Sequence, residues 1–365
     1  MMKIELEQDK QYRAFAVQLI DYEEAIIVRR GNYELTISGE DAGEVLERLI
    51  SCALEKDMSK SEMLNLFMAE YQDVVGELVD LLIEKNILAE ADNIDSDERQ
   101  NESSLEIFYW NFGIDAKVVT ERLNSANLVI VGVNEISRQL VTRLRETGVE
   151  NLTVVDDPIG RNFGFFDQQN QLNHVAWPDS LPVPQDYETW GSEVDPSQIG
   201  CLVVTSDHGG QQFIRDWNQQ CIDSGVTLFP IILRNLIGFI GPYVVPGESA
   251  CFECFRARQN SHIEDPAEVR ASELYAFEGQ KLNGYHPSMT AILGEYGAFE
   301  LTKIFGRGIS RYRVGTVVRV NMILPQVSSH KVLKLPRCPV CSSLNSRSAE
   351  TPSKTTFMPG HRIEE

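Results

Sequence analysis

Four cysteines stand out because they occur as two closely spaced pairs. Cys251 and Cys254 enclose two residues, and Cys338 and Cys341 enclose two residues far downstream, each pair in a turn-rich segment. Four thiolates are a ligand set for a tetrahedral zinc ion, whereas one such pair alone would also suit a redox dithiol. Neither pair stands at the start of a thioredoxin-like helix, and four sulfur ligands leave no open position for catalysis. We therefore predict one structural Zn²⁺ bound by all four cysteines.

A second group of residues with chemical meaning lies in the segment 126–158. An apolar run ends at Gly132, a helix-compatible run follows, and a second apolar run ends at Asp156. The order of strand, tight turn, helix, strand and acidic residue begins a dinucleotide-binding βαβ unit. In the Gly-x-Gly-x-x-Gly register, however, Asn134 and Ser137 occupy the second and third glycine positions. Those glycines allow close approach of a phosphate and close helix packing, so we predict the architecture with a damaged phosphate site.

Composition and charge limit the kinds of partner. The chain has 365 residues, 42% of them hydrophobic, and a net charge of −21. Within residues 1–100 the charge is 10 − 24 = −14. We do not expect a nucleic-acid partner, because neutralising phosphates requires a basic surface. The N-terminus has no apolar signal core, and no run of about 20 apolar residues occurs, so we expect a soluble, cytoplasmic protein without membrane contact.

Residues 12–90 have the pattern of a small α+β domain. Three short β-prone runs come first, a turn at Gly31 joins the last two in a hairpin, and three helices follow. The second helix opens with a capping box at Ser59, and Asn86 ends the third. This order predicts a winged-helix-like domain of residues 1–90, followed by an acidic linker at 91–104. The runs cover residues 14–20, 25–30 and 32–38, and the main helices lie at 41–54 and 74–85.

Residues 105–341 are predicted to form a second, larger domain. The first βαβ unit is followed by another, with a buried strand at 201–205, a helix at 211–224 and a strand at 226–232. Two such units predict an α/β fold with an open, mostly parallel, doubly wound sheet and helices on both faces. Between residues 158 and 196 we expect irregular structure, and residues 342–365 are predicted to be a flexible tail. A helix at 287–305 and a hairpin at 316–335 complete the domain.

Together these features resemble a known family. The turn at Gly132, the strand end at Asp207, the Gly-Pro-Tyr-x-x-Pro-Gly motif from Gly241 and the two cysteine pairs follow the order of the ThiF-like, ubiquitin-activating-enzyme-like fold. This resemblance covers residues 108–341. Residues 12–90 resemble the PqqD-like RiPP recognition element, which in its family binds the leader of a ribosomally made precursor peptide. The combination is similar to the ThiF-like partner protein of thiazole/oxazole-modified microcin clusters, and to the peptide-adenylating enzyme of microcin C maturation.

The resemblance also allows the residues of the nucleotide pocket to be compared with those of active family members. Active members use a Gly-rich turn, an acid for the ribose, an Arg and a Lys for the phosphates, and an Asp for Mg²⁺. Asp156 matches the ribose acid and Asp207 matches the metal-holding Asp. Glu135 places a carboxylate where phosphate should lie, and no lysine occurs between Val118 and Gln280. The comparison implies a pseudoenzyme, for which ATP is not an expected cofactor.

Two functions of different classes follow from these features. The favoured one is a scaffold that binds a leader peptide and delivers the precursor to a separate YcaO-type cyclodehydratase for thiazoline or oxazoline formation. The alternative is a ThiF-like, ATP-dependent peptide-adenylating enzyme with a divergent pocket, supported by Asp156 and Asp207 alone. A plain NAD(P)-binding protein is a third possibility, against which the same missing glycines count. A homodimer is also possible, since ThiF-like relatives commonly form one.

The resemblance and the strand order imply a peptide site in the first domain. If the three strands pair in order, residues 32–38 lie at a sheet edge, where an extended peptide can add as a further strand. The helix at 74–85 would form the other wall, although its apolar residues could equally be core. Because this domain is acidic, we expect basic or apolar leader anchors. The residues assigned to this site are Asn32, Tyr33, Glu34, Leu35, Thr36, Ile37, Val75, Leu78, Val79 and Leu82.

Overall fold

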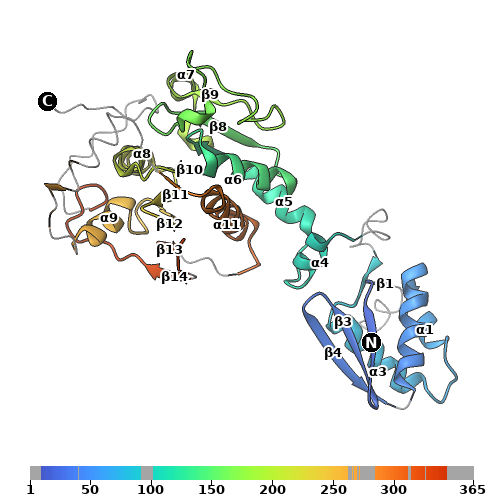
Figure 1. Ribbon diagram of the computed structural model, residues 1–365. Coiled ribbons are helices and arrows are strands. Elements are labelled where there is room, and N and C mark those ends of the chain that lie inside the picture. Colours follow the sequence, from blue (N-terminus) through green and yellow to red (C-terminus); the bar gives the residue numbers. More distant parts are fainter. Residues whose placement is uncertain are drawn as a thin grey trace. The chain divides into compact units, whose positions relative to one another are not determined.

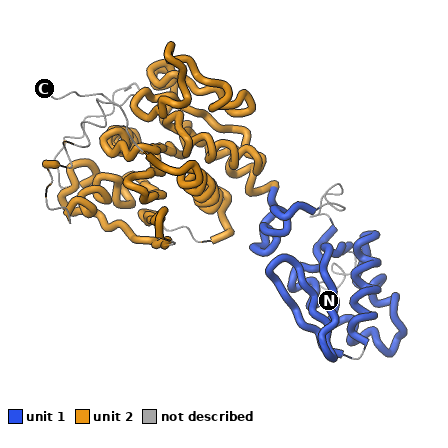
Figure 2. The backbone as a smooth tube through the Cα atoms, viewed as in Figure 1, with its two compact units in different colours: residues 1–116 blue, residues 117–365 orange. Residues whose placement is uncertain are grey.

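The computed structural model describes residues 10–39, 41–91, 102–261, 265, 267–268, 271, 284–310, 314–324 and 326–342. Most of the expected linker and nearly all of the expected tail lie outside these residues. The chain divides into two compact units, residues 1–116 and residues 117–365 (Figure 2). We expected the second domain to begin at residue 105, but the division lies later, and Trp110 packs against the core of the first unit.

Two small sheets and four helices form the described part of the first unit (Figure 1). The strand orders are β5-β1-β6 and β2-β3-β4. In chain order the elements are β1 (Gln11–Ala14), β2 (Gln18–Tyr22), β3 (Ala25–Arg30), β4 (Tyr33–Ser38), α1 (Ala42–Glu55), β5 (Met58–Ser59), α2 (Lys60–Leu64), α3 (Gln72–Glu84), β6 (Leu88–Glu90) and α4 (Ser104–Trp110).

The first expected strand is two separate strands. The chain bends between β1 and β2, where the Phe15 N–H donates to the carbonyl of Ile87 at 2.9 Å. In the same bend, Nη1 of Arg30 donates to the carbonyl of Ala16 at 2.7 Å. As a result β1 pairs with β5 and β6 and not with its neighbour in sequence. The first unit thus has more strands than we expected, and the winged-helix-like arrangement is not shown.

The core of the first unit encloses one face of α3. Val75, Val79 and Leu82 are at most 2% exposed and belong to one cluster with residues of β3 and α1. A peptide cannot reach these three side chains in this structure, so their assignment to the peptide site is corrected. Leu78 is half-buried at the margin of the same cluster. Asn86 has φ of 57° directly after α3, which confirms the expected left-handed helix end.

The second unit is built around one large sheet. Its elements are α5 (Ala116–Ser125), β7 (Leu128–Val131), α6 (Glu135–Glu146), β8 (Leu152–Asp156), η3 (Phe163–Phe165), β9 (Gln185–Asp186), α7 (Tyr187–Glu193), η4 (Pro196–Gln198), β10 (Cys201–Ser206), α8 (Gln211–Ser224), β11 (Leu228–Arg234), β12 (Ile237–Ile240), α9 (Phe252–Asn260), α11 (Pro287–Gly306), β13 (Thr316–Asn321) and β14 (Gln326–Lys331).

The described strands of this sheet lie in the order β14-β13-β12-β11-β10-β7-β8-β9. Neighbours from β11 to β9 are parallel, and β12, β13 and β14 extend the sheet antiparallel. Every residue of β10 is buried, as expected for a strand covered on both faces. Helices α6 and α11 pack on one face and α8 and α9 on the other (Figure 1). The α/β fold with a mostly parallel sheet is therefore confirmed.

Two parts of the second unit differ from the expectation. The segment 158–196, expected to be irregular, contains η3, β9 and α7, and its Trp177 is only 2% exposed. The short helix α7 escaped the pattern because two turns carry too few apolar positions to show a period. Strand β12 was missed for the same reason, since it has only four residues. None of the helices in the described ranges is both long and apolar enough to cross a bilayer.

Candidate functional site

The order of the strands places the candidate nucleotide pocket. Strands β7 and β10 are neighbours, while the chain continues from β7 to β8 on one side and from β10 to β11 on the other. Doubly wound sheets bind ligands at such a switch point, at the carboxyl ends of the strands. Gly132 follows β7, Asp156 ends β8 and Asp207 follows β10. The structure therefore brings the residues assigned to the nucleotide pocket together at the carboxyl ends of these strands.

The amides at the start of α6 are occupied by the protein's own side chains. Asn134 caps the helix, and its Oδ1 accepts hydrogen bonds from the N–H groups of Ile136 and Ser137, both at 3.1 Å. In return, Oγ of Ser137 accepts from the N–H of Asn134 at 3.0 Å. Free amides at a helix N-terminus are what binds phosphate in nucleotide-binding folds. Here the residues at the second and third glycine positions form a closed capping box, so these amides are engaged within the protein.

Asn134 is fixed in this position from a second direction. It is fully buried, and its Nδ2 donates to the carbonyls of Gly160 at 3.2 Å and Thr205 at 3.1 Å. Gly132 has φ of 102°, and a Cβ at that position would lie 2.9 Å from both Nδ2 of Asn134 and the Thr205 carbonyl. The one remaining glycine of the pattern thus makes room for Asn134 and Thr205.

Glu135 adds negative charge at the same helix end. Burial raises the pKa of its carboxyl, the nearby Arg138 lowers it, and Asp207 raises it further, so the net direction is upward. The carboxylate is paired with Arg138. This pairing partly balances the negative charge that Glu135 places at the helix start.

Asp156, the expected ribose-binding acid, is also engaged within the protein. Both of its carboxylate oxygens accept from Arg161, with Nε and Nη2 each at 2.6 Å. The hydrogen bond to Asp156 raises the pKa of Arg161. The guanidinium lies 4.3 Å from the ring centre of Phe166, which holds it in place. A ribose would have to displace this bidentate ion pair.

Asp207 is a buried carboxylate that accepts hydrogen bonds from uncharged donors, among them the backbone N–H of Glu135 at 3.4 Å. It is 3% exposed and accepts from Nδ2 of Asn162 and from the Tyr285 hydroxyl, both at 2.7 Å. Burial raises the pKa of Asp207, but hydrogen bonds from His208, Tyr285 and Asn162 outweigh it, so the pKa lies below its usual value. Sequence reasoning missed Asn162 and Tyr285, which are 45 and 78 residues from Asp207 and belong to no motif.

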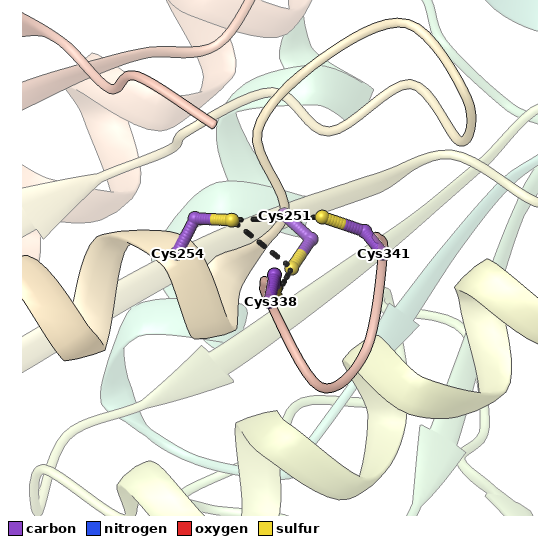
Figure 3. Close-up of side chains that lie close together, drawn as sticks. All are labelled: Cys251, Cys254, Cys338 and Cys341. Atoms are coloured by element: carbon purple, nitrogen blue, oxygen red, sulfur yellow. Dashed lines mark hydrogen bonds between the residues drawn. The ribbon is translucent and has the colours of Figure 1, made fainter. Parts of the chain in front are cut away.

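The four paired cysteines meet at one point. Cys251 and Cys254 lie at the start of α9, and Cys338 and Cys341 lie on the turn that follows β14 (Figure 3). Their sulfur atoms all lie within 4.8 Å of one another, and of these four cysteines all but Cys341 are buried. The backbone N–H of Leu335 donates to the Cys254 sulfur at 3.4 Å. The expected ligand set is therefore assembled, together with a second-sphere donor.

The spacing of the sulfurs fits a tetrahedral ion. Zn–S bonds of about 2.3 Å in a tetrahedron place the sulfurs about 3.8 Å apart. The sulfur of Cys251 lies 3.9 Å from that of Cys254 and 3.6 Å from that of Cys338, and Cys254 lies 3.5 Å from Cys341. A disulfide requires about 2.05 Å, so these are not oxidised pairs. Mutual hydrogen bonds lower the pKa of Cys254 and raise that of Cys251, because the clustered thiols share their protons.

In the first unit, β4 forms an outer edge of the β2-β3-β4 sheet, as expected. A two-residue turn joins it to β3, and Gly31 has the positive φ of 58° that such turns require. The flanking residues Arg30 and Tyr33 then form a hydrogen-bonded pair, and such pairs alternate along an antiparallel ladder. The N–H groups of Glu34 and Thr36 therefore point away from β3, and no strand within the described residues takes them.

One face of β4 is apolar and only partly covered. Tyr33, Leu35 and Ile37 are half-buried and alternate with exposed polar residues. Leu35 and Ile37 pack against the same core cluster as Leu78 of α3. The open backbone edge therefore runs beside side chains that still have apolar surface to bury.

Trp110 connects this edge with the end of α3. Its ring lies 6.2 Å from that of Tyr33, and its Nε1 donates to the carbonyl of Asn86 at 3.1 Å. The Arg30 guanidinium is held between the rings of Phe15 and Trp110, 4.5 and 4.8 Å from their centres. These contacts were not predicted, because nothing in the local sequence relates Trp110 to residues of β4 and α3.

At the other end of β4 the surface is hollowed and acidic. A groove of about 1310 Å³ is lined by Thr36 and Ser38 of β4 and by residues of β2, β3 and α1. No Lys or Arg is among its described lining residues. Its carboxylates belong to Asp21, Glu23, Glu24, Asp41, Glu44 and Glu47.

Comparison with known proteins identifies the fold. No protein-family model and no curated protein matches the sequence. The crystal structure of E. coli MccB with succinimide is 16% identical, covers 91% of this chain and 99% of its own, and has a TM-score of 0.62. A heterocyclase in complex with substrate and cofactor is 18% identical with a TM-score of 0.55, and the heterocyclase TruD is 18% identical with a TM-score of 0.56. Both matches cover 91% of this chain, which spans only 40% and 43% of those heterocyclase chains. The likeness shows that this chain has the fold of MccB and of a part of the heterocyclases.

Proposed function

We propose that this chain binds the leader of a ribosomally made precursor peptide and delivers the peptide to a separate YcaO-type cyclodehydratase, which forms thiazolines or oxazolines. The observation that carries the proposal is the open edge of β4, where the N–H groups of Glu34 and Thr36 are free of strand partners in the described chain. A leader that adds as a strand gains main-chain hydrogen bonds there.

The surroundings of the edge suggest what the leader must contain. Alternate side chains of an added strand would face the half-buried Leu35 and Ile37, where apolar residues can be covered from water. Further along β4, the described residues that line the groove at Thr36 and Ser38 include several carboxylates and no Lys or Arg. We therefore expect apolar anchors beside the middle of β4 and basic residues beside its end. Binding should weaken as salt rises if the basic residues contribute.

The second unit supports a scaffold more than an ATP-using enzyme. The start of α6 is closed by the side chains of Asn134 and Ser137, and Asp156 is paired with Arg161. Each of the groups that would hold a nucleotide therefore has a partner within the protein. In this proposal the fold is kept as a rigid support, and a zinc ion bound by the four cysteines fixes its C-terminal turn.

The alternative function is an ATP-dependent peptide-adenylating enzyme like that of microcin C maturation. One observation favours it: this chain matches 99% of the length of MccB, which has also been solved with ATP. Pyrophosphate exchange with Mg-ATP and the precursor peptide separates the two functions. A scaffold gives no exchange, whereas robust exchange would establish the alternative.

The leader site is tested with a matched pair of variants. Thr36→Pro removes an outward N–H, whereas Thr36→Val keeps it and keeps a β-branched side chain. The measurement is fluorescence polarisation of a labelled precursor leader peptide, titrated with the full-length chain. Loss of one net hydrogen bond of about 1 kcal/mol predicts at least a roughly fivefold weaker Kd for Thr36→Pro and an unchanged Kd for Thr36→Val. Equal binding by a folded Thr36→Pro would place the leader elsewhere.

A further inference from the structure

The large sheet ends in a second open edge. Strand β14 pairs with β13, and no strand in the described part of the chain lies along its other side. The N–H of Val332 donates to the carbonyl of Gly315 at 2.8 Å, which fixes the alternation of the ladder. The N–H groups of Val327 and Ser329 therefore point away from β13.

This edge lacks the features that usually protect an open strand. β14 has six residues, contains no proline, and carries no charge in its middle. Apolar side chains beside it are exposed: Ile323 is 64% exposed, and Val327 and Leu333 are each 59% exposed. A six-residue edge whose Lys stands only at its end, with exposed apolar residues in and beside it, is a surface that another strand can join.

The surrounding sequence has an unusual charge. Acidic residues make up 54 of the 365 in the chain, yet none occurs between Glu300 and Glu350, a stretch that contains nine Lys and Arg residues. The charge of this stretch is therefore opposite in sign to the net charge of −21 of the whole chain. Such an asymmetry attracts a partner of the opposite charge.

Three basic side chains near β14 have no carboxylate partner among the residues that the structure describes. Across the described residues, none of the carboxylates forms an ion pair with Arg319, Lys331 or Lys334. The Nζ atoms of these lysines instead donate to backbone carbonyls, Lys331 to Val314 at 2.5 Å and Lys334 to Gly247 at 2.6 Å. Lys331 is the last residue of β14 and Lys334 follows three residues later, so both positive charges belong to the C-terminal end of this strand.

We propose that the outer edge of β14 docks an acidic, extended segment of a separate protein. The free amides select a strand, the apolar neighbours give it surface to cover, and the unpaired Arg and Lys side chains select negative charge. A second β14 is equally basic and would be repelled, and nucleic acid cannot continue a strand ladder. The inference rests on the proposed function in one respect, because that function requires a separate enzyme to which this chain binds. The chain spans only 40% of the heterocyclase chain that it resembles.

The test uses a fluorescein-labelled octapeptide of alternating Glu and Val and the full-length protein. We expect saturable binding that weakens as salt rises, and no binding of the matching Lys-Val octapeptide. Ser329→Pro removes an outward N–H and should weaken binding about fivefold or more, whereas Ser329→Val keeps the N–H and should not. Lys334→Gln, which removes one charge without touching the strand, should weaken binding at low salt and lose that effect at high salt.

Several results would overturn the proposal. They are no binding of the Glu-Val peptide, equal binding by Ser329→Pro, preferential binding of duplex DNA, and light scattering that shows a dimer broken by Ser329→Pro. Thr36→Pro serves as the cross-control because it alters the other open edge. It should leave Glu-Val binding unchanged, while Ser329→Pro should leave leader binding unchanged. The docking proposal can thus fail while the leader site stands, and the reverse also holds.

Discussion

Replacing Cys338 by serine removes one of the four sulfur ligands and should destabilise the second unit strongly. Cys338 is fully buried, and its sulfur lies 3.6 Å from that of Cys251. Three remaining thiolates bind zinc less tightly than four, so the metal no longer fixes the turn after β14 to the start of α9. A polar hydroxyl is also left in a site built for sulfur.

The magnitude follows from the length of chain that the metal closes. Cys251 and Cys338 are 87 residues apart, and cross-linking a loop of this length lowers the unfolded-state entropy by the equivalent of roughly 4 to 5 kcal/mol. This figure applies if zinc cross-links the cysteines in the unfolded chain as well. We expect Cys338→Ser to reduce the free energy of unfolding of the second unit by roughly that amount.

The assay combines metal analysis with urea unfolding. Trp190 and Trp217 lie in the same hydrophobic cluster as Cys251 and Cys338, so their fluorescence reports on this region. Metal analysis should give about one zinc per wild-type chain and much less for Cys338→Ser. Cys221→Ala is the control, because Cys221 is equally buried but lies outside the four-sulfur cluster. That variant should keep its zinc and lose only about 1 kcal/mol.

One result would refute the reasoning. If Cys338→Ser is folded, contains no zinc and unfolds at the same urea concentration as the wild type, the metal does not contribute to stability. Zinc-free wild-type protein, prepared with a chelator, provides the same comparison without a mutation. It should match Cys338→Ser in stability if the loss of metal is the cause.

Two further predictions concern the closed pocket. Asn134→Ala removes the α6 cap and three buried hydrogen bonds from Nδ2, so we expect about 2 kcal/mol less unfolding free energy. Calorimetry of the wild type with Mg-ATP should give no heat of binding, and ATP binding by the wild type, whose α6 amides are capped, would contradict the closed-pocket account. Tyr285→Phe removes a donor from Asp207, whose pKa is depressed in the folded state. A carboxyl group whose pKa is depressed by folding stabilises the protein above its ordinary pKa of about 4, and this stability is lost as the pH falls through the folded value. Tyr285→Phe should therefore show a smaller fall in urea midpoint between about pH 6 and about pH 3 than the wild type. An identical acid dependence would show that Tyr285 does not hold that pKa.

The sequence by itself determined the features that depend on local pattern. Cysteine spacing identified all four members of the sulfur cluster, and apolar runs ending at Gly132 and Asp156 located β7 and β8. The turn at Gly31 and the left-handed Asn86 also followed from local backbone preference. Each of these features is visible in residues that lie close together in the sequence, as a ligand spacing, an apolar run or a turn preference.

Only the tertiary structure decided which groups are free and which are engaged. The helical stripe of α3 could face a peptide or the core, and packing against β3 and α1 placed Val79 and Leu82 in the core. Asp156 matched a ribose-binding acid in sequence, but the fold pairs it with Arg161. Which amides of β4 point outward depends on the pairing with β3. Side chains from distant segments meet only when the sheet assembles, so their contacts leave no periodic trace in the chain.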